Sequence, residues 1–194
     1  MPRITAPTVV ENRELRREAL MGAAADLLRR DGTFTMSVVA REVGLSRSAV
    51  YEYYDSAPDL IADVVVAELT AWRDWLVSAS SPGATPRERV QLWIGAVLAF
   101  VADGRHALIR AAGSAELPPS RRAEVTDLHQ SLITPLVDAL ADSGTADPGR
   151  QARYVWAVVE VAIGRIENAE ATPAEESRAL LSFIDAALGG PEDR

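Results

Sequence analysis

The chain has 194 residues, of which 48% are hydrophobic, enough to bury a core. It has no cysteine, which excludes disulfides, thiolate metal sites and cysteine nucleophiles, and no apolar stretch reaches the roughly eighteen residues of a membrane span, so we expect a soluble, cytoplasmic protein without membrane contact. The formal net charge of -8 opposes phosphate binding, but residues 1–54 hold 8 Arg against 7 acidic residues, so a nucleic-acid surface is expected only there.

Apolar residues recur at spacings of three and four along most of the chain, and Pro and Gly separate the periodic segments. This pattern predicts an all-α fold of about nine helices. We expect them at residues 12–30, 36–43, 47–54, 57–80, 86–103, 105–114, 120–143, 148–169 and 173–188.

Residues 35–54, TMSVVAREVGLSRSAVYEYY, predict two short helices joined by a tight turn. Ala40 is small enough for a close helix crossing, Gly44 can adopt the left-handed conformation of the turn, and Val50 faces back to the first helix. This spacing is typical of a DNA-binding helix-turn-helix, and its alternative is an ordinary helical hairpin. The opposite face of the second helix is polar, with Arg47 and Tyr53 among its residues.

Residues 16–65 closely resemble the DNA-binding domain of the tetracycline-repressor (TetR) family. The resemblance rests on the amphipathic first helix ending at Asp31-Gly32, on the 35–44 helix and turn, and on the run from Ser46 to Tyr54 followed by Asp55-Ser56. It implies a flexible arm (1–10), a DNA-binding domain (11–56) and a ligand-binding and dimerisation domain (57–190).

By this resemblance the chain is expected to be a homodimeric regulator, commonly a repressor released from a palindromic operator in double-stranded DNA by a largely apolar small molecule, with no cofactor and no metal. The residues expected to contact DNA are Thr35, Ser37, Ser46, Arg47, Ser48, Ala49, Tyr51 and Tyr53.

Two positions depart from the family pattern. Ala57 stands where a lysine usually contacts phosphate, and Tyr53 stands where the family usually has histidine. We therefore expect weaker contact with the DNA backbone, or compensation from N-terminal arginines. Those arginines are Arg3, Arg13, Arg16 and Arg17.

The apolar surface of the C-terminal helices has two competing uses, a ligand cavity and a dimer seam. Candidate cavity residues are Trp72, Trp93, Phe100, Leu108, His129, Ile133, Tyr154 and Glu160, each of which can instead be core. Candidate seam residues are Trp156, Val159, Ile163, Leu180, Leu181, Phe183, Ile184 and Ala187.

Two of these assignments carry further alternatives. Glu160 is expected to pair with Arg153 or Arg165 or to lie in solvent at the helix edge; if it instead faces the cavity, it would favour a cationic ligand. The helix at 105–114, with Arg105, His106 and Arg110, is expected to link ligand and DNA sites, or to be a solvated face.

Two rival functions follow from other readings of the chain. An enzyme is disfavoured, since the two histidines are isolated and no phosphate-binding glycine loop, HExxH or GxSxG motif is present. A partner-regulated or effector-independent DNA-binding protein with a filled core is the second alternative.

Overall fold

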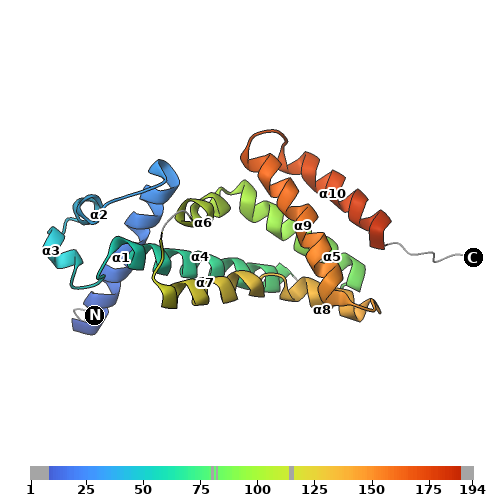
Figure 1. The fold of residues 1–194 in the computed structure, drawn as a ribbon, viewed down its shortest axis with the longest axis horizontal. Coiled ribbons are helices and arrows are strands. Elements are labelled where there is room, and N and C mark those ends of the chain that lie inside the picture. The colour runs from blue at the N-terminus through green and yellow to red at the C-terminus, as the bar shows by residue number, and fades with distance from the viewer. Residues whose placement is uncertain (1–8, 80, 82, 114–115, 189–194) are drawn as a thin grey trace, which may run out of the picture. The chain divides into compact units, whose positions relative to one another are not determined.

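The computed structural model describes residues 9–79, 81, 83–113 and 116–188, and within these ranges every regular element is a helix (Figure 1). The all-α prediction is confirmed. The helices are α1 (Val9–Asp31), α2 (Met36–Glu42), α3 (Arg47–Val50), α4 (Ala57–Ala79), α5 (Pro86–Ala102), α6 (Arg105–Gly113), α7 (Pro119–Ser131), α8 (Thr134–Asp142), α9 (Pro148–Glu167) and α10 (Pro173–Leu188). No single helix of the described part is long and apolar enough to cross a membrane.

The chain divides into two compact units. The first contains Met1–Ala67 and Leu108–Val125, and the second contains Glu68–Ala107 and Thr126–Arg194. Val9 and Val10, which the sequence assigned to a flexible arm, are the first two residues of α1.

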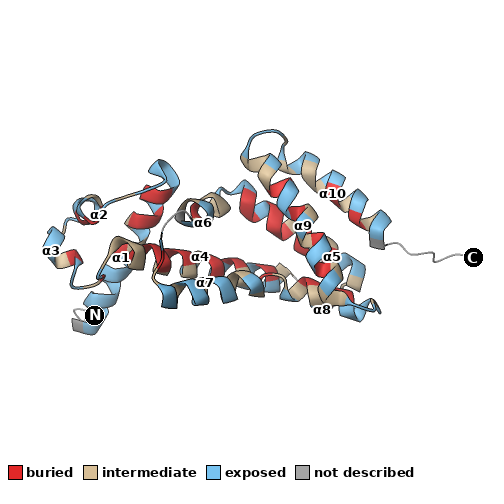
Figure 2. Ribbon diagram, viewed as in Figure 1, coloured by how far each residue is buried: buried red, intermediate tan, exposed pale blue. Residues whose placement is uncertain are grey.

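The core of the first unit is formed where α1, α2 and α3 meet. Leu20 and Leu28 of α1, Val39 of α2 and Val50 of α3 are at most 3% exposed, and α2 contacts both α1 and α3. Figure 2 shows the buried residues as short red stripes on these helices, with exposed residues on their outer sides. Burial of these stripes supplies the main stabilisation of the unit, because helices this short are marginal in isolation.

The core of the second unit lies among α5, α8, α9 and α10, which contact one another. α5 is buried on most of its surface, including Trp93, Ile94 and Val97, and it starts with a capping box between Thr85 and Glu88. α5 is therefore covered on several sides, by α8, α9 and α10.

The helix predicted at 120–143 is broken in two, which corrects the sequence interpretation. Pro135 occupies the first turn of α8, and α7 ends at Ser131. Proline lacks the N–H that would continue the helix, and its ring clashes with the carbonyl four residues earlier, that of Ser131, where α7 ends. At the break, the Leu132 carbonyl accepts a 3.1 Å hydrogen bond from Trp93 Nε1, so the interruption provides the partner that a buried indole N–H needs.

Candidate nucleic-acid interface and candidate ligand hollow

The turn between α2 and α3 has the geometry that the sequence predicts. Gly44 has φ 68°, and the amides of Leu45 and Gly44 donate to the carbonyls of Ala40 (2.8 Å) and Arg41 (3.2 Å). These two bonds define a Schellman motif, which ends α2 and reverses the chain. Added side-chain atoms at Gly44 would meet nothing within 4 Å, so its backbone conformation, rather than crowding, explains the glycine.

Both short helices are capped by hydroxyl side chains at their first turns. Thr35 accepts from the Val38 amide at 3.4 Å and Ser46 accepts from the Ala49 amide at 3.1 Å. Ser48 Oγ lies 2.9 Å from Ser46 Oγ. The caps satisfy backbone N–H groups that would otherwise lack partners and fix where each helix begins.

After Val50 the chain continues in a helical turn through residues 51–53, where the sequence predicted regular helix to Tyr54. Tyr54 is buried and its amide still donates to the Val50 carbonyl at 3.1 Å. Arg47 and Tyr51 form a pair on the outer face of this segment, with the guanidinium 3.4 Å from the phenolic oxygen and 5.8 Å from the ring centroid. The phenol thus holds a cation on an exposed helix face.

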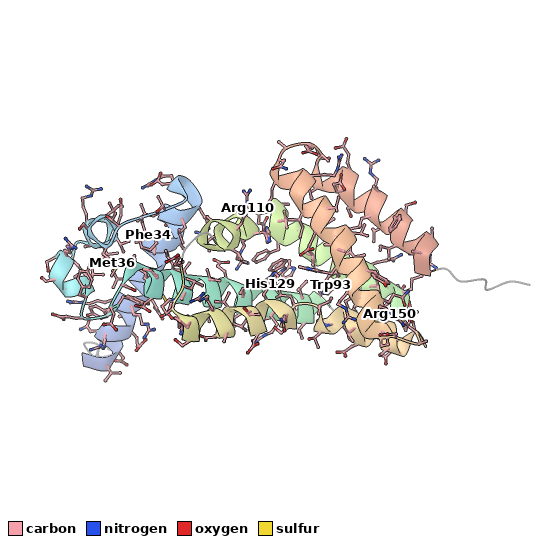
Figure 3. All side chains as sticks on the ribbon, viewed as in Figure 1. Phe34, Met36, Trp93, Arg110, His129 and Arg150 are labelled. Atoms are coloured by element: carbon pink, nitrogen blue, oxygen red, sulfur yellow. The ribbon has the colours of Figure 1, made fainter. Side chains whose placement is uncertain are left out.

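All eight residues predicted to contact DNA lie on α2, α3 and the segments that flank them. Six are exposed, and Ala49 and Tyr53 are half-buried. The inner side of the same helices is apolar, and Met36, labelled in Figure 3, is one of its buried residues. One polar face and one buried face are the arrangement required for an element that packs on a domain and meets a second molecule.

Tyr53 has a cation beside it, supplied by α1. The Arg13 guanidinium carbon lies 5.4 Å from the centroid of the Tyr53 ring, and its Nη2 donates to the Glu52 carbonyl at 3.1 Å. One of the N-terminal arginines expected to compensate thus lies beside Tyr53, and its contact with DNA stays a prediction. Arg3 lies outside the described residues.

Arg17 has a different role, which the sequence did not predict. Its Nε donates to the Tyr54 hydroxyl at 3.2 Å, and its Nη2 forms an ion pair with Asp63. Asp63 also accepts from the Tyr54 hydroxyl at 3.1 Å and pairs with Arg121 of α7. This Asp63 cluster joins α1, α4, α7 and the end of the helix-turn-helix, so Arg17 is a structural residue.

The pKa values of the Asp63 cluster are shifted by these contacts. The hydrogen bond to Asp63 raises the pKa of Arg17 further above its usual range. Burial raises the pKa of Tyr54 to about 12, against the opposing effect of Arg17. Tyr54 is therefore a neutral hydrogen-bond donor over the physiological pH range.

A hollow of about 460 Å³ in the second unit, here named the α9 hollow, is taken as the candidate ligand site because predicted cavity residues line it. Its apolar wall consists of Leu132, Ile133, Val137 and Trp156. His129, Gln130 and Arg153 supply polar groups, and Gly149 completes the lining. Figure 3 labels His129 on α7, and its ring contacts that of Trp156 edge-on at 5.8 Å. Among the predicted cavity residues, only His129 and Ile133 line it.

Three of the predicted cavity residues belong to the core and do not line the hollow: Trp72, Trp93 and Phe100. Trp72 stacks on Phe100 with ring centroids 4.4 Å apart and planes 2° apart. Trp156 connects this aromatic core to the hollow, because its ring lies 5.8 Å from Trp93 and 6.5 Å from Trp72. Leu108 is fully buried and belongs to the first unit.

Tyr154 and Glu160 correct the cavity prediction. Tyr154 is 66% exposed, and Glu160 is exposed and accepts a 2.8 Å hydrogen bond from Trp156 Nε1. Arg165, one of its two predicted partners, instead pairs with Glu176 at 2.7 Å. The helix was predicted correctly from its apolar periodicity. Its side chains point in different directions around the helix axis, so some residues of α9 line the hollow and others lie on the open surface.

The seam prediction is also corrected in part, because the larger apolar residues of α9 and α10 fill the core of the unit. Val159, Ile163, Leu180 and Ile184 are at most 4% exposed, and Trp156 is half-buried among aromatic rings. Of the remaining predicted seam residues, Phe183 is 56% exposed, Ala187 is exposed and Leu181 is half-buried. Tyr154 and Val161 of α9, 66% and 63% exposed, are apolar surface residues that the prediction omitted.

The first two residues of α6 contact carboxylates rather than lying on a solvated face. Arg105 pairs with Glu68 at 2.9 Å and lies over the Phe100 ring, while His106 Nδ1 lies 2.8 Å from Glu167. Arg110, labelled in Figure 3, is exposed.

The chain is similar to known transcriptional regulators. No family model matches the chain. It is 38% identical over 82 residues to the HTH-type transcriptional regulator BetI of Rhizobium meliloti (strain 1021), a match that spans 41% of this chain and 40% of that protein.

Solved structures match over nearly the whole length. A TetR-like transcriptional regulator from Rhodococcus sp. RHA1 has a TM-score of 0.70 at 23% identity, covering 96% of this chain and 100% of that one. The TetR family regulator PfmR from Thermus thermophilus has 0.69 at 16%, covering 97% and 100%. FadR from Bacillus subtilis, in complex with stearoyl-CoA, has 0.68 at 15%, covering 86% and 96%. The fold is that of these regulators, which confirms the resemblance noted in the sequence.

Proposed function

We propose that this chain, which has the fold of TetR-family transcriptional regulators, binds double-stranded operator DNA through α2 and α3 as a homodimer and is controlled by a small molecule. The observation that carries the proposal is the exposed polar face of the helix-turn-helix, held by capped helices and a Schellman turn. The cation and hydroxyl groups on this face are suited to phosphates and base edges. Repression is the direction of control that we propose.

A positive charge at the candidate interface supports the DNA assignment despite the acidic chain. The Arg47–Tyr51 pair lies on α3 and its following turn, and Arg13 lies beside Tyr53. The family pattern leads one to expect cations at positions 53 and 57. At position 53, the neighbouring Arg13 supplies a cation instead. Arg13 and Arg47 are the first candidates for phosphate and guanine contacts.

Control by a small molecule is supported by the α9 hollow. Its volume of about 460 Å³ lies in the range of small-molecule sites, roughly 300–1,000 Å³. A filled core would instead favour the effector-independent alternative. Stearoyl-CoA bound to the B. subtilis FadR supports small-molecule binding by this fold without identifying the ligand of this chain.

A homodimer is supported by the apolar surface on α9 and α10. Tyr154 and Val161 are two helical turns apart on one face of α9, and Phe183 is exposed on α10. A two-fold dimer would present two recognition helices to a palindromic site.

Selection of bound DNA from a random pool tests the proposal directly. Enrichment of one palindromic sequence by the full chain is the expected result. Failure to enrich any sequence, with a folded protein, would overturn the DNA-binding function. Enrichment of a single half-site without its inverted repeat would retain DNA binding and overturn the dimeric mode.

A further inference from the structure

The α9 hollow has one charged side chain on its wall, that of Arg153. Its Nη1 lies 4.0 Å from the position that a Cβ atom on Gly149 would occupy, and Asp147 Oδ1 lies at the same distance from that position, so the guanidinium lies beside the first turn of α9. Among the described residues, Arg153 has no ion pair or hydrogen bond. A cation on a concave wall without a counter-ion is therefore open to a ligand.

Two carboxylates at the start and middle of α9, those of Asp147 and Glu160, have other partners and form no ion pair with Arg153. Asp147 caps α9 by accepting from the Arg150 amide at 3.0 Å and pairs with the Arg150 side chain, also at 3.0 Å. Glu160 is hydrogen-bonded to the indole of Trp156 and does not line the hollow. The charge presented by the wall is therefore positive.

The rest of the wall is uncharged. Burial, together with the nearby His106, lowers the pKa of His129, so its imidazole is neutral at pH 7. His129 and the Gln130 amide therefore offer neutral hydrogen-bonding groups, and the Trp156 ring provides a flat apolar surface. A ligand with one anionic end and an apolar body would match each part of the wall.

We infer that the effector is an organic anion whose carboxylate is bound by Arg153 and whose aromatic or branched apolar body packs on Trp156. A guanidinium binds a carboxylate through two parallel hydrogen bonds, which orients the ligand as well as attracting it. The inference rests on the proposed function, in which this hollow is the effector site. It reverses the cationic preference expected from Glu160 in the sequence.

Three probes with the same apolar body and different head groups test the charge preference: phenylbutyrate, phenylbutyramide and phenylbutylamine. Their dissociation constants for the full chain are measured by calorimetry and by quenching of tryptophan fluorescence. The acid is expected to bind at least about tenfold more tightly than the amide, and the amine more weakly still. Arg153→Gln is expected to remove the preference for the acid. Arg150→Gln, on the same helix but outside the lining, is the matched control and is expected to retain it.

Equal affinity for acid and amide, a preference for the amine, absence of binding by all three, or an acid preference that persists in Arg153→Gln would each overturn the inference. The random-pool DNA selection is carried out on the same protein without probes. Enrichment of an operator together with one of these negative results would reject the anionic ligand alone, whereas failed enrichment with acid binding would reject the DNA-binding function alone.

Discussion

The Tyr54 hydroxyl donates a 3.1 Å hydrogen bond to Asp63, and this contact joins the end of the helix-turn-helix to α4. The same carboxylate also receives Arg17 from α1 and Arg121 from α7, and its side chain is only 13% exposed. Asp63 is therefore the position at which four segments of the first unit share one charge. Its contacts position the exposed polar face of α2 and α3, and Asp63 itself does not lie on that face.

Asp63→Asn is expected to lower the free energy of unfolding by about 1–3 kcal/mol, because two guanidinium groups lose their shared counter-ion. The expected loss of unfolding free energy is smaller than for a fully buried ion pair, because the Arg17 side chain is 46% exposed. Urea unfolding of the full chain measures the loss. Asp26→Asn, which removes an exposed ion pair with Arg29, is the control and should cost less than about 0.5 kcal/mol. Equal losses in the two variants would contradict a special role for Asp63.

The alkaline stability of the protein should depend on Tyr54. Its folded pKa, raised by burial to about 12, lies above the value near 10 of an unfolded tyrosine. Between these values the folded chain retains a proton that the unfolded chain has lost, so the free energy of unfolding falls as pH rises from 10 to 12. Below pH 10 this contribution is fully present.

Denaturant unfolding at a series of alkaline pH values measures this slope, and the absence of lysine from the sequence removes the usual competing titration. Tyr54→Phe should flatten the decline and remove the last step of the tyrosinate absorbance titration. Tyr154→Phe, at an exposed position, is the control. The prediction fails if Tyr54→Phe leaves both curves unchanged.

Substitutions on the exposed polar face of the helix-turn-helix should separate two kinds of DNA contact. Tyr53→Ala is expected to weaken operator and non-operator DNA alike, because a phosphate contact carries no sequence information. Arg47→Ala should cost about 1–3 kcal/mol at one base position and relax the preference there. Fluorescence anisotropy at fixed salt measures both, with Arg178→Ala on α10 as the control.

Arg13→Gln is expected to make the dependence of operator affinity on salt less steep. The slope of the logarithm of affinity against the logarithm of salt concentration should fall by roughly one per bound protomer, because one fewer counter-ion is released. The reason is the position of its guanidinium beside Tyr53, at 5.4 Å from the ring centroid. Affinities measured over a salt series give the slope. An unchanged slope would place Arg13 outside the DNA contact and leave it as a partner of the tyrosine ring.

Local features were predictable from the sequence because their physical causes lie within a few residues. Thr35 and Ser46 cap helices that begin directly after them, and Gly44 takes the one conformation that its turn requires. The break between α7 and α8 also had a local signal, Pro135 inside a predicted helix, which the apolar periodicity overrode.

Long-range relationships were not predictable in the same way. The contacts of Asp63 with Arg17 and Arg121 join residues 46 and 58 positions apart, and no periodicity indicates such pairs. The division of α9 into core and surface depends on how α5, α8 and α10 cover it. Val159 and Val161 lie on opposite sides of the helix, and the packing of the other helices decides that Val159 is the covered one, at 0% exposure against 63%.

Charge introduced on the exposed apolar face of α9 and α10 should separate the proposed dimer. Val161→Asp and Phe183→Asp place an aspartate at positions 63% and 56% exposed in the protomer, so each isolated protomer should still fold. In a dimer the same carboxylates would be desolvated without a partner, which makes association unfavourable. Light scattering should report a monomer, and the affinity for a palindromic operator should fall by about a hundredfold or more because the second half-site is no longer bound by a linked subunit.

Val77→Asp is the matched control, since Val77 is 56% exposed on α4. It should retain the dimer and its operator affinity, with circular dichroism confirming helical content in all three variants. A monomeric wild-type protein, or dimers that persist in both Val161→Asp and Phe183→Asp, would exclude α9 and α10 as the interface. If Val77→Asp alone dissociated the dimer, the interface would instead lie over the groove bordered by Trp75 and Leu92, which are 49% and 40% exposed.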